Sequence, residues 1–382
     1  MKIVDDWIKR AETQAVCHML TKAGYQALFV GGCVRNALLN APVHDIDIAT
    51  DAHPDKVMML AAEAGLKPVP TGIDHGTVTV VSNHIPHEVT TFREDVETFG
   101  RRAVVAYSDD VTQDARRRDF TMNALYARPD GTVLDPLGGL PDLEARHVRF
   151  IDDANQRIRE DYLRILRFFR FHAWYGDPSC GLDCEGLAAV ATHLEGLSGL
   201  SRERVGSEVV KLLSAPDPAP SVAAMRATGV LAAVLPGADD RVLALLVHLE
   251  QSANLSPDAM RRLACLGGDD PALLLRLSKA QTKRLRSLRD GMESPATTAE
   301  LGYRHGADVA LDIVVLRDAM LEAPFDPSAR HLAEAGARAE FPVSARDLMP
   351  AYSGPALGAR LNELEKRWIA SGFTLTQDEL LR

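Results

Sequence analysis

The chain has 382 residues, of which 46% are hydrophobic and 25% charged, and its formal net charge is −10. This length predicts two to four domains, because a domain usually holds roughly 100–200 residues. The acidic balance argues against a nucleic-acid binder with a uniformly basic surface, but it leaves room for a local basic patch. No apolar run reaches the roughly 20 residues of a membrane span, and the first ten residues lack a signal-peptide core. We therefore expect a cytoplasmic protein that does not associate with membranes.

The N-terminal part of the sequence alternates short strands with helices, and 94–109 is irregular and predicts a mobile loop. Apolar runs and periodicity predict these further elements: a helix over 4–24, a strand over 27–30, a helix over 34–39, a strand over 44–50, a helix over 54–64, strands over 77–81 and 88–91, and a helix over 118–127. The glycine-containing segment 135–139 marks the expected end of this head.

From about residue 140 onward the pattern predicts only helices, including one over 157–175 and one over 202–214. The predicted fold class is α+β. A head over 1–139 holds a small mixed sheet with helices, and an all-helical neck over 140–215 is followed by a helical body and tail over 216–382. Five scattered cysteines form no Cys-x-x-Cys pair, which favours reduced structural thiols over a zinc site or a disulfide framework.

Asp45 and Asp47 lie on the predicted strand over 44–50, so their carboxylates share one face while Ile46 and Ile48 face the core. Two carboxylates this close repel each other and stay ionised together only with a cation between them. Mg²⁺ prefers oxygen ligands and commonly bridges carboxylates to substrate phosphates. For the pair alone, a solvated polar face on an edge strand is the competing interpretation.

A Gly31-Gly32 turn and a helix start precede this pair of aspartates. Glycines permit close backbone approach, and the N–H groups of a helix N-terminus can bind phosphate oxygens. Arg35, one helical turn further on, is a candidate phosphate clamp. A phosphate cradle beside a metal-binding strand suits nucleotidyl transfer, in which two metal ions activate the attacking hydroxyl and stabilise the leaving pyrophosphate.

Residues 28–39 (LFVGGCVRNALL) and 45–50 (DIDIAT) closely resemble the first motif of class II CCA-adding enzymes. These are tRNA nucleotidyltransferases of the polymerase β superfamily, and bacterial poly(A) polymerases share the motif. The family usually has an aspartate at the position of Asn36. The resemblance implies that the head is a nucleotidyltransferase domain with Mg²⁺ at Asp45 and Asp47, and that Gly31, Gly32 and Arg35 contact the nucleotide.

Residues 114–125 (DARRRDFTMNAL) resemble a second motif of this family. Basic residues disfavour a helix N-terminus, so a run of three arginines there hints at an acidic or phosphate ligand. A solvated basic turn is the alternative. The resemblance implies that Arg118 and Asp119 hold the ribose and the triphosphate.

Residues 159–171 (REDYLRILRFFRF) carry Asp161, Arg164, Arg167 and Arg170 at every third position, which forms a slanting polar ridge on one helix. An ion-paired amphipathic helix would give the same pattern. Asp offers acceptors and Arg a planar donor fork, which suits reading a base edge. The segment also matches the family motif in which Asp and Arg select CTP and ATP, so the resemblance assigns base reading to Asp161 and Arg164. Arg167 and Arg170 would then face the phosphates or the primer.

Three shorter segments add to the resemblance. Residues 87–93 (HEVTTFR) contain Glu88, a candidate third carboxylate of the catalytic site, and 201–208 (SRERVGSE) resembles the structural neck helix. Residues 99–102 (FGRR) fall where the family has a flexible loop that related CC-adding enzymes lack, although its usual first residue is Asp. The predicted function is addition of CCA to the tRNA 3′ end from CTP and ATP, with residues 216–382 binding tRNA. The alternatives are a poly(A) polymerase, a partial CC- or A-adding enzyme, and an inactive RNA-binding homologue.

Overall fold

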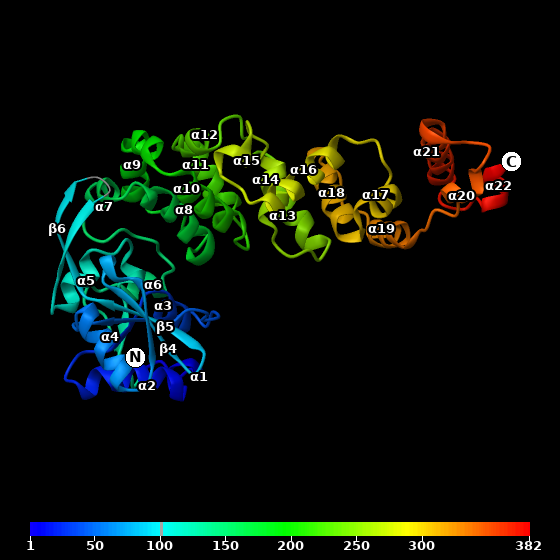
Figure 1. Ribbon diagram of the computed structural model, residues 1–382. Coiled ribbons are helices and arrows are strands. Elements are labelled where there is room, and N and C mark those ends of the chain that lie inside the picture. The colour runs from blue at the N-terminus through cyan, green and yellow to red at the C-terminus, as the bar shows by residue number, and fades with distance from the viewer. Residues whose placement is uncertain (100–101) are drawn as a thin grey trace. The chain divides into compact units, whose positions relative to one another are not determined.

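The computed structural model describes residues 1–99 and 102–382, which fall into two compact units. The first unit comprises residues 1–208 and 220–234, and the second comprises 209–219 and 235–382. Figure 1 shows that strands are confined to the N-terminal part of the chain and that helices make up the rest. The α+β fold class predicted from the sequence is confirmed. The expected head boundary near residue 139 falls inside the first unit and stays a prediction.

A mixed sheet of seven strands organises the first unit. Its strands lie in the order β3 (Lys67–Gly72), β4 (Thr77–Ser82), β5 (Ile85–Thr91), β2 (Asp47–Thr50), β1 (Leu28–Val30), β8 (Tyr126–Ala127) and β9 (Val133–Leu134). Only β2 and β5 pair in parallel among the described strands, with Asp47 opposite Glu88, and the other neighbours are antiparallel. This register is the feature that positions the candidate site.

Short helices surround this sheet, and the structure corrects two predictions about them. The helices are α1 (Asp6–Lys9), α2 (Ala11–Lys22), α3 (Gly32–Leu38), α4 (Pro54–Glu63), α5 (Val111–Arg116) and α6 (Leu140–Glu144). The single helix expected over 4–24 is two helices, because Arg10 has an extended backbone with ψ 135°. The helix expected over 118–127 is instead a 3₁₀ turn, η2 (Thr121–Asn123), followed by β8, whose residues are buried in the sheet.

The expected irregular loop over 94–109 is a second, two-stranded sheet of β6 (Arg93–Phe99) and β7 (Arg102–Tyr107). The prediction was wrong for the strands because cross-strand backbone pairing, not local apolar alternation, builds this hairpin. Gly100 and Arg101, which belong to the segment expected to be the family's flexible loop, lie outside the described residues.

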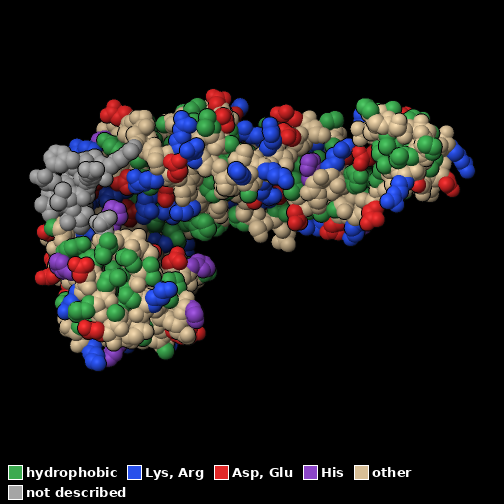
Figure 2. Space-filling model, in the orientation of Figure 1, with side chains coloured by type: hydrophobic (Ala, Val, Ile, Leu, Met, Phe, Trp, Pro, Cys, Tyr) green, Lys and Arg blue, Asp and Glu red, His purple; other side chains and the backbone are tan. Residues whose placement is uncertain are grey.

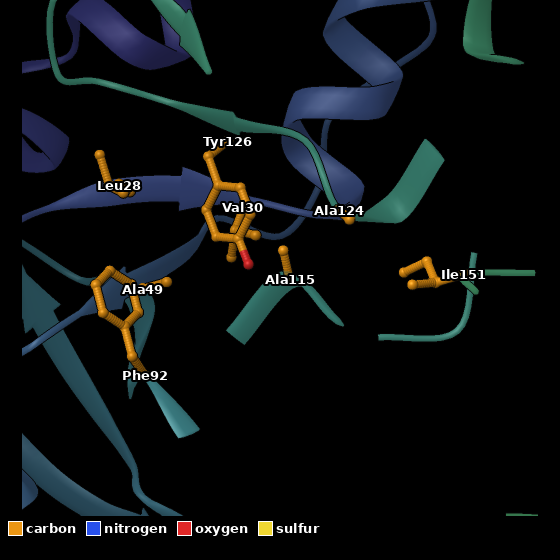
Figure 3. Packing of buried hydrophobic residues seen from close by; sticks show 8 residues of the cluster. All are labelled: Leu28, Val30, Ala49, Phe92, Ala115, Ala124, Tyr126 and Ile151. Carbon is orange, nitrogen blue, oxygen red and sulfur yellow. The ribbon is translucent and has the colours of Figure 1, made fainter. Parts of the chain in front are cut away.

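A hydrophobic cluster joins the sheet to the segment that carries the three arginines. Figure 3 shows the ring of Tyr126 from β8 among the side chains of Val30, Ala49 and Ala115, with Phe92 on the same side of the strands. All of these side chains are buried. Because protein interiors are close-packed, this cluster fixes where α5 ends and the arginine run begins.

The rest of the first unit is helical. Its helices are α7 (Ala154–Glu160), α8 (Leu163–Tyr175), α9 (Cys184–Thr192), the first turns of α10 (Arg202–Leu213), α11 (Ala219–Ala227) and α12 (Val230–Val234). The single helix expected over 157–175 is therefore wrong. Asp161, with φ −152° and ψ 104°, ends α7, and α8 starts two residues later.

The second unit is all helical within the described residues. Its further helices are α13 (Leu243–Ser252), α14 (Ala259–Leu266), α15 (Pro271–Leu274), α16 (Lys279–Glu293), α17 (Thr298–His305), α18 (Ala307–Met320), α19 (Ser328–Arg338), α20 (Ala345–Leu348), α21 (Gly354–Ala370) and α22 (Gln377–Leu381). Buried ion pairs link Arg261 and Arg262 of α14 to Glu250 of α13, and Arg261 also to Asp312 of α18. An apolar cluster around Trp368 holds the C-terminal helices together.

The cysteines and the hydropathy of the helices bear on the class of protein. All five cysteines are unpaired; Cys17, Cys33 and Cys265 are buried, whereas Cys180 and Cys184 are exposed. Within residues 1–99 and 102–382, no helix combines the length and the apolar character that crossing a membrane would require.

Candidate active site

Three carboxylates lie at one edge of the parallel strand pair. Asp47 is the first residue of β2 and stands opposite Glu88 of β5 in the register, so both side chains project from the same face of the sheet. Asp45 precedes the strand by two residues and is exposed, as is Glu88, whereas Asp47 is partly buried. The strand predicted over 44–50 thus begins later, at Asp47, and the structure places Asp45, Asp47 and Glu88 near one another.

The electrostatics of Asp47 fit a cation. Burial, followed by the neighbouring carboxylate of Glu88, raises the pKa of Asp47 to about 6, and Asp45 adds to the rise while Arg118 opposes it. A nearby positive charge would oppose these effects by favouring the ionised form of Asp47. In the described part of the chain no three His, Cys, Asp or Glu side chains form a ready-made metal cage. Two or three loosely held carboxylates suit Mg²⁺, which usually completes its shell with water and substrate phosphates.

The glycine turn lies beside the arginine run. Gly31 has φ +68°, a conformation that other residues rarely adopt, and it caps the N-terminus of α3. A Cβ atom on Gly31 would lie 3.4 Å from Nη1 of Arg118. The turn therefore leaves room for the guanidinium, and the backbone N–H groups of α3 begin next to a positive charge.

Arg118 is oriented by a buried acid. Its Nη2 donates to Oδ2 of Asp114 at 2.9 Å, and its Nε donates to the hydroxyl of Tyr126 at 3.1 Å. Burial would raise the pKa of the Asp114 carboxyl, but Arg118 and Arg117 outweigh it and hold that pKa well below its usual range. Arg118 Nη1, the nitrogen nearest Gly31, makes no hydrogen bond within the described residues, so it is available to a ligand.

Arg35 is buried and engaged with protein groups. It is 6% exposed, and its guanidinium donates to Oδ1 of Asn123 at 2.5 Å and to the hydroxyl of Tyr175 at 2.9 Å, with the Tyr175 ring centroid 4.0 Å away. It also donates to Oδ1 of Asn36, whose Nδ2 donates to the carbonyl of Pro42 at 2.9 Å. The asparagine at this position can make both bonds because it is a donor and an acceptor, whereas an aspartate is an acceptor only.

Asp119 faces the helical part of the first unit. Its Oδ2 accepts from Nε of Arg167 at 2.7 Å, and its Oδ1 accepts from Nδ2 of Asn123 and from the N–H of Phe120, both at 2.9 Å. Burial favours the neutral acid, but Arg167 and Asn123 outweigh it and lower the pKa of Asp119. Asp119 is thus an ionised carboxylate that orients Arg167.

Arg164 sits where α7 ends. Its Nη1 donates to Oε2 of Glu160 at 2.6 Å and to the carbonyl of Arg157 at 2.8 Å, and its Nη2 donates to the carbonyl of Arg117 at 2.8 Å. Three of the five N–H groups of the guanidinium are used, so two remain for a ligand. The backbone carbonyl of Arg117, in the arginine run, therefore helps to orient Arg164 of α8.

Asp161 and Arg170 are held by α10. Oδ2 of Asp161 accepts from Nη2 of Arg204 at 2.6 Å, and Oδ1 accepts from the N–H of Leu163 at 3.1 Å. Arg170 donates from Nε to Oε2 of Glu208 at 2.5 Å. The i,i+3 pair expected between Asp161 and Arg164 does not form, because Asp161 lies in the break between α7 and α8.

A cavity of about 230 Å³ gathers most of the predicted nucleotide-binding residues. It is lined by Arg117, Arg118, Asp119, Asp161, Arg164 and Arg167. Arg118 lines this cavity and also opposes the rise in the pKa of Asp47, so the Asp47 carboxylate lies within electrostatic range of the cavity. Arg35 and Arg170 do not line the cavity. Arg35 is linked to its lining through Asn123, and Arg170 is linked to it through Glu208.

Sequence reasoning missed several residues that hold this site together. They are Asp114, Asn123, Tyr126, Glu160, Arg204 and Glu208. The four-residue spacing of Arg204 and Glu208, which puts a cation and an acid on one helix face, was the available signal. The positions of their partners depend on tertiary contacts.

The fold and this site define a nucleotidyltransferase with a mixed-sheet head followed by helices. Residues 27–149 match the model of the poly A polymerase head domain, and residues 182–241 match the model described as probable RNA and SrmB-binding site of polymerase A.

Relatives over most of the chain have more specific names. The chain is 31% identical to the mitochondrial CCA tRNA nucleotidyltransferase 1 of Mus musculus, over 96% of this chain and 88% of the relative. It is 32% identical to the CCA-adding enzyme of Lacticaseibacillus paracasei, over 94% and 92% of the two chains. The solved Bacillus stearothermophilus CCA-adding enzyme in complex with CTP superposes with a TM-score of 0.78 at 28% identity, covering 96% of this chain and 94% of that one. The chain belongs to the family of CCA-adding enzymes.

Proposed function

We propose that this chain adds CCA to the 3′ end of tRNA, using CTP and ATP and releasing pyrophosphate, without a nucleic-acid template. The observation that carries the proposal is the single cavity that holds Asp161, Arg164 and Arg167 and is linked through Arg118 to the carboxylates around Asp47. Such a site combines a place for a base with a place for phosphate chemistry. The names of the relatives over most of the chain support the same activity.

We assign base selection to the polar groups of Asp161 and Arg164. Cytosine N4 and adenine N6 are amino donors, and a carboxylate can accept from either. The two free N–H groups of Arg164 can donate to ring nitrogens or to a carbonyl oxygen of the base. A small cavity with one acceptor and one fork of donors therefore selects the two bases without a template strand.

We assign phosphate binding to Arg118, Arg167 and the N-terminus of α3. Arg118 Nη1 lies beside Gly31, which caps the N-terminus of α3, where the first N–H groups of the helix have no partner within the helix. Arg167 keeps three N–H groups after its bonds to Asp119. In this proposal Arg35 and Arg170 position neighbouring groups, Arg35 through Tyr175 and Arg170 through Glu208.

We assign the divalent metal, Mg²⁺ in this proposal, to Asp45 and Asp47, with Glu88 close enough to contribute. When bound, the metal supplies activation of the tRNA 3′ hydroxyl and stabilisation of the leaving pyrophosphate. Ionised Asp47 has to be available for this role, and its raised pKa makes the ionised form dominant only above about pH 6.

We propose that the second unit contributes to tRNA binding and that the protein acts in the cytoplasm. Helix α16 carries Lys279, Lys283 and Arg286, which are exposed and make no ion pair within the described residues. They line a cavity of about 690 Å³ together with Thr282 and Arg289. Figure 2 shows Lys and Arg side chains over the region that Figure 1 labels α14 to α16. Unpaired cations of this kind neutralise nucleic-acid phosphates.

The proposal is tested by incubating the purified protein with tRNAs that end before C74, before C75 and before A76, together with CTP, ATP and Mg²⁺. We expect each tRNA to be extended to A76 and no further. Absence of extension on all three would refute the proposal. Long A tails would favour the poly(A) polymerase, and a stop after C75 would favour a CC-adding enzyme.

A further inference from the structure

Two residues of α10 hold the polar side chains that surround the cavity. Arg204 and Glu208 lie four residues apart and therefore on one face of the helix. Arg204 binds Asp161, and Glu208 binds Arg170 at 2.5 Å and lies 4.0 Å from Nη1 of Arg167. Neither Arg204 nor Glu208 lines the cavity, so they act on it through their partners.

Because Asp161 lies outside both helices, the bond to Arg204 has a large effect on the orientation of its side chain. Asp161 lies in a break between two helices, and its extended backbone does not restrict the side chain as a helix would. Two bonds fix its carboxylate: the N–H of Leu163 binds Oδ1, and Nη2 of Arg204 binds Oδ2. Each carboxylate oxygen can accept a second hydrogen bond, so both keep an acceptor site for a base. Charge-assisted bonds of this kind are short and directional.

We infer that Arg204 is a specificity-determining residue that fixes the orientation of the Asp161 carboxylate as a hydrogen-bond acceptor. This inference rests on the proposed function. A carboxylate held in this orientation accepts hydrogen bonds from the amino groups of cytosine and adenine, and it repels the carbonyl oxygens that uracil and guanine present at the corresponding positions. Without Arg204, the Asp161 side chain can rotate away from the base, and its repulsion of such a carbonyl is lost. Loss of Arg204 then relaxes discrimination against UTP and GTP.

The test compares Arg204→Ala, Arg204→Lys and the control Arg202→Ala with the unaltered enzyme. Arg202 lies on the same helix, is exposed and makes no ion pair within the described residues. We expect Arg204→Ala to raise KM for CTP and ATP about five- to tenfold, the size of one charge-assisted hydrogen bond at a half-exposed site. UTP incorporation relative to CTP should rise at least as much, while kcat for CTP and tRNA affinity change little. Arg204→Lys should restore part of the selectivity, and Arg202→Ala should match the unaltered enzyme.

A double-mutant cycle separates positioning from a general structural effect. If Arg204 acts through Asp161, then Arg204→Ala adds nothing to KM or to UTP misincorporation once Asp161 is Ala.

Fully additive effects in the cycle, or unchanged selectivity in Arg204→Ala, would overturn the inference. A variant that has lost its circular-dichroism spectrum and cooperative melting would be replaced by Arg204→Gln, which keeps the length and a donor. Failure of the unaltered enzyme to extend tRNA refutes the proposed function instead, so the two outcomes are distinguishable.

Discussion

The carboxylate of Asp119 accepts a hydrogen bond from Nε of Arg167 at 2.7 Å and forms an ion pair with its Nη2 at 2.5 Å, and it thereby links the end of the arginine run to helix α8. The Asp119 side chain is buried, and that of Arg167 is about one-third exposed. The pair closes one side of the cavity, since both residues line it. Its integrity therefore governs both the shape of the cavity and the stability of the first unit.

Asp119→Ala should lower the free energy of unfolding by about 2 kcal/mol, because it strips a largely buried guanidinium of its charged partner. It should also lower kcat/KM for CTP at least tenfold, since Arg167 loses its orientation. Urea unfolding and steady-state kinetics measure the two effects. Asp109→Ala, at an exposed aspartate of the same unit, is the control and should stay within about 0.5 kcal/mol. Equal behaviour of the two variants would contradict a positioning role for Asp119.

Asp47→Asn should abolish nucleotide addition and leave the fold intact. Without metal, it should even be more stable than the unaltered protein at pH 8. The carboxyl group of Asp47 has its pKa raised to about 6, so its ionised form costs the folded state free energy. We expect a gain of about 1–2 kcal/mol in EDTA, measured by urea unfolding. Mg²⁺ should stabilise the unaltered protein but not the variant. Retained turnover would remove Asp47 from the metal site.

The same pKa predicts how activity and stability depend on pH. The folded state binds a proton at Asp47 more tightly than the unfolded chain does, so this residue's contribution to stability falls as pH rises from about 4 to about 6. Metal binding requires the ionised form, so at limiting Mg²⁺ the rate should fall about tenfold per pH unit below about pH 6. Excess Mg²⁺ should shift this fall to lower pH. A rate profile insensitive to the Mg²⁺ concentration would contradict this assignment.

Arg164→Ala should blur the choice between CTP and ATP more than it weakens tRNA binding. The variant removes the two free N–H groups that we assign to the base, and it leaves Glu160 without its 2.6 Å partner. We expect the CTP-to-ATP preference at the C74 step to drop about tenfold. Competition assays with both nucleotides measure the ratio, and Arg159→Ala, an exposed arginine of α7, is the control. An unchanged ratio would count against base reading by Arg164.

Replacing Lys283 and Arg286 of α16 together with Ala should weaken tRNA binding and leave the KM for CTP on a saturating tRNA unchanged. Each lost phosphate contact should reduce the slope of log K against log salt by about 1. Titrations at several salt concentrations measure this slope. Lys22→Ala, an exposed lysine at the end of α2, is the matched control. An unchanged slope would mean that this face of α16 does not contact the tRNA.

Local patterns in the sequence were enough to predict the parts of the site that lie close together in the chain. The alternation of polar and apolar residues around Asp47 predicted the strand. The Gly31-Gly32 pair predicted the turn, in which Gly31 has a positive φ. The carboxylates are placed by one strand register, which period-two alternation largely determines. The α+β fold class was predictable because the hydrophobic pattern contains strands before about residue 140 and only helices after it.

Only the tertiary structure decided which charged groups are partners. Asp119 and Arg167 are 48 residues apart, and Asp161 and Arg204 are 43 apart, so no spacing rule connects them. The helix break at Asp161 was missed because the apolar periodicity runs through it, while the side chain itself binds the N–H of Leu163.

The sequence by itself determined which chemical groups the candidate site contains, because strands, turns and helix faces depend on neighbours along the chain. The tertiary structure decided which groups are free for ligands. Arg35, a candidate phosphate clamp by sequence, donates instead to Tyr175 and Asn123, whereas Arg118 keeps Nη1 beside Gly31. The reason is physical: a buried guanidinium must satisfy its donors within the protein, and only the packing of distant segments determines which arginine is buried.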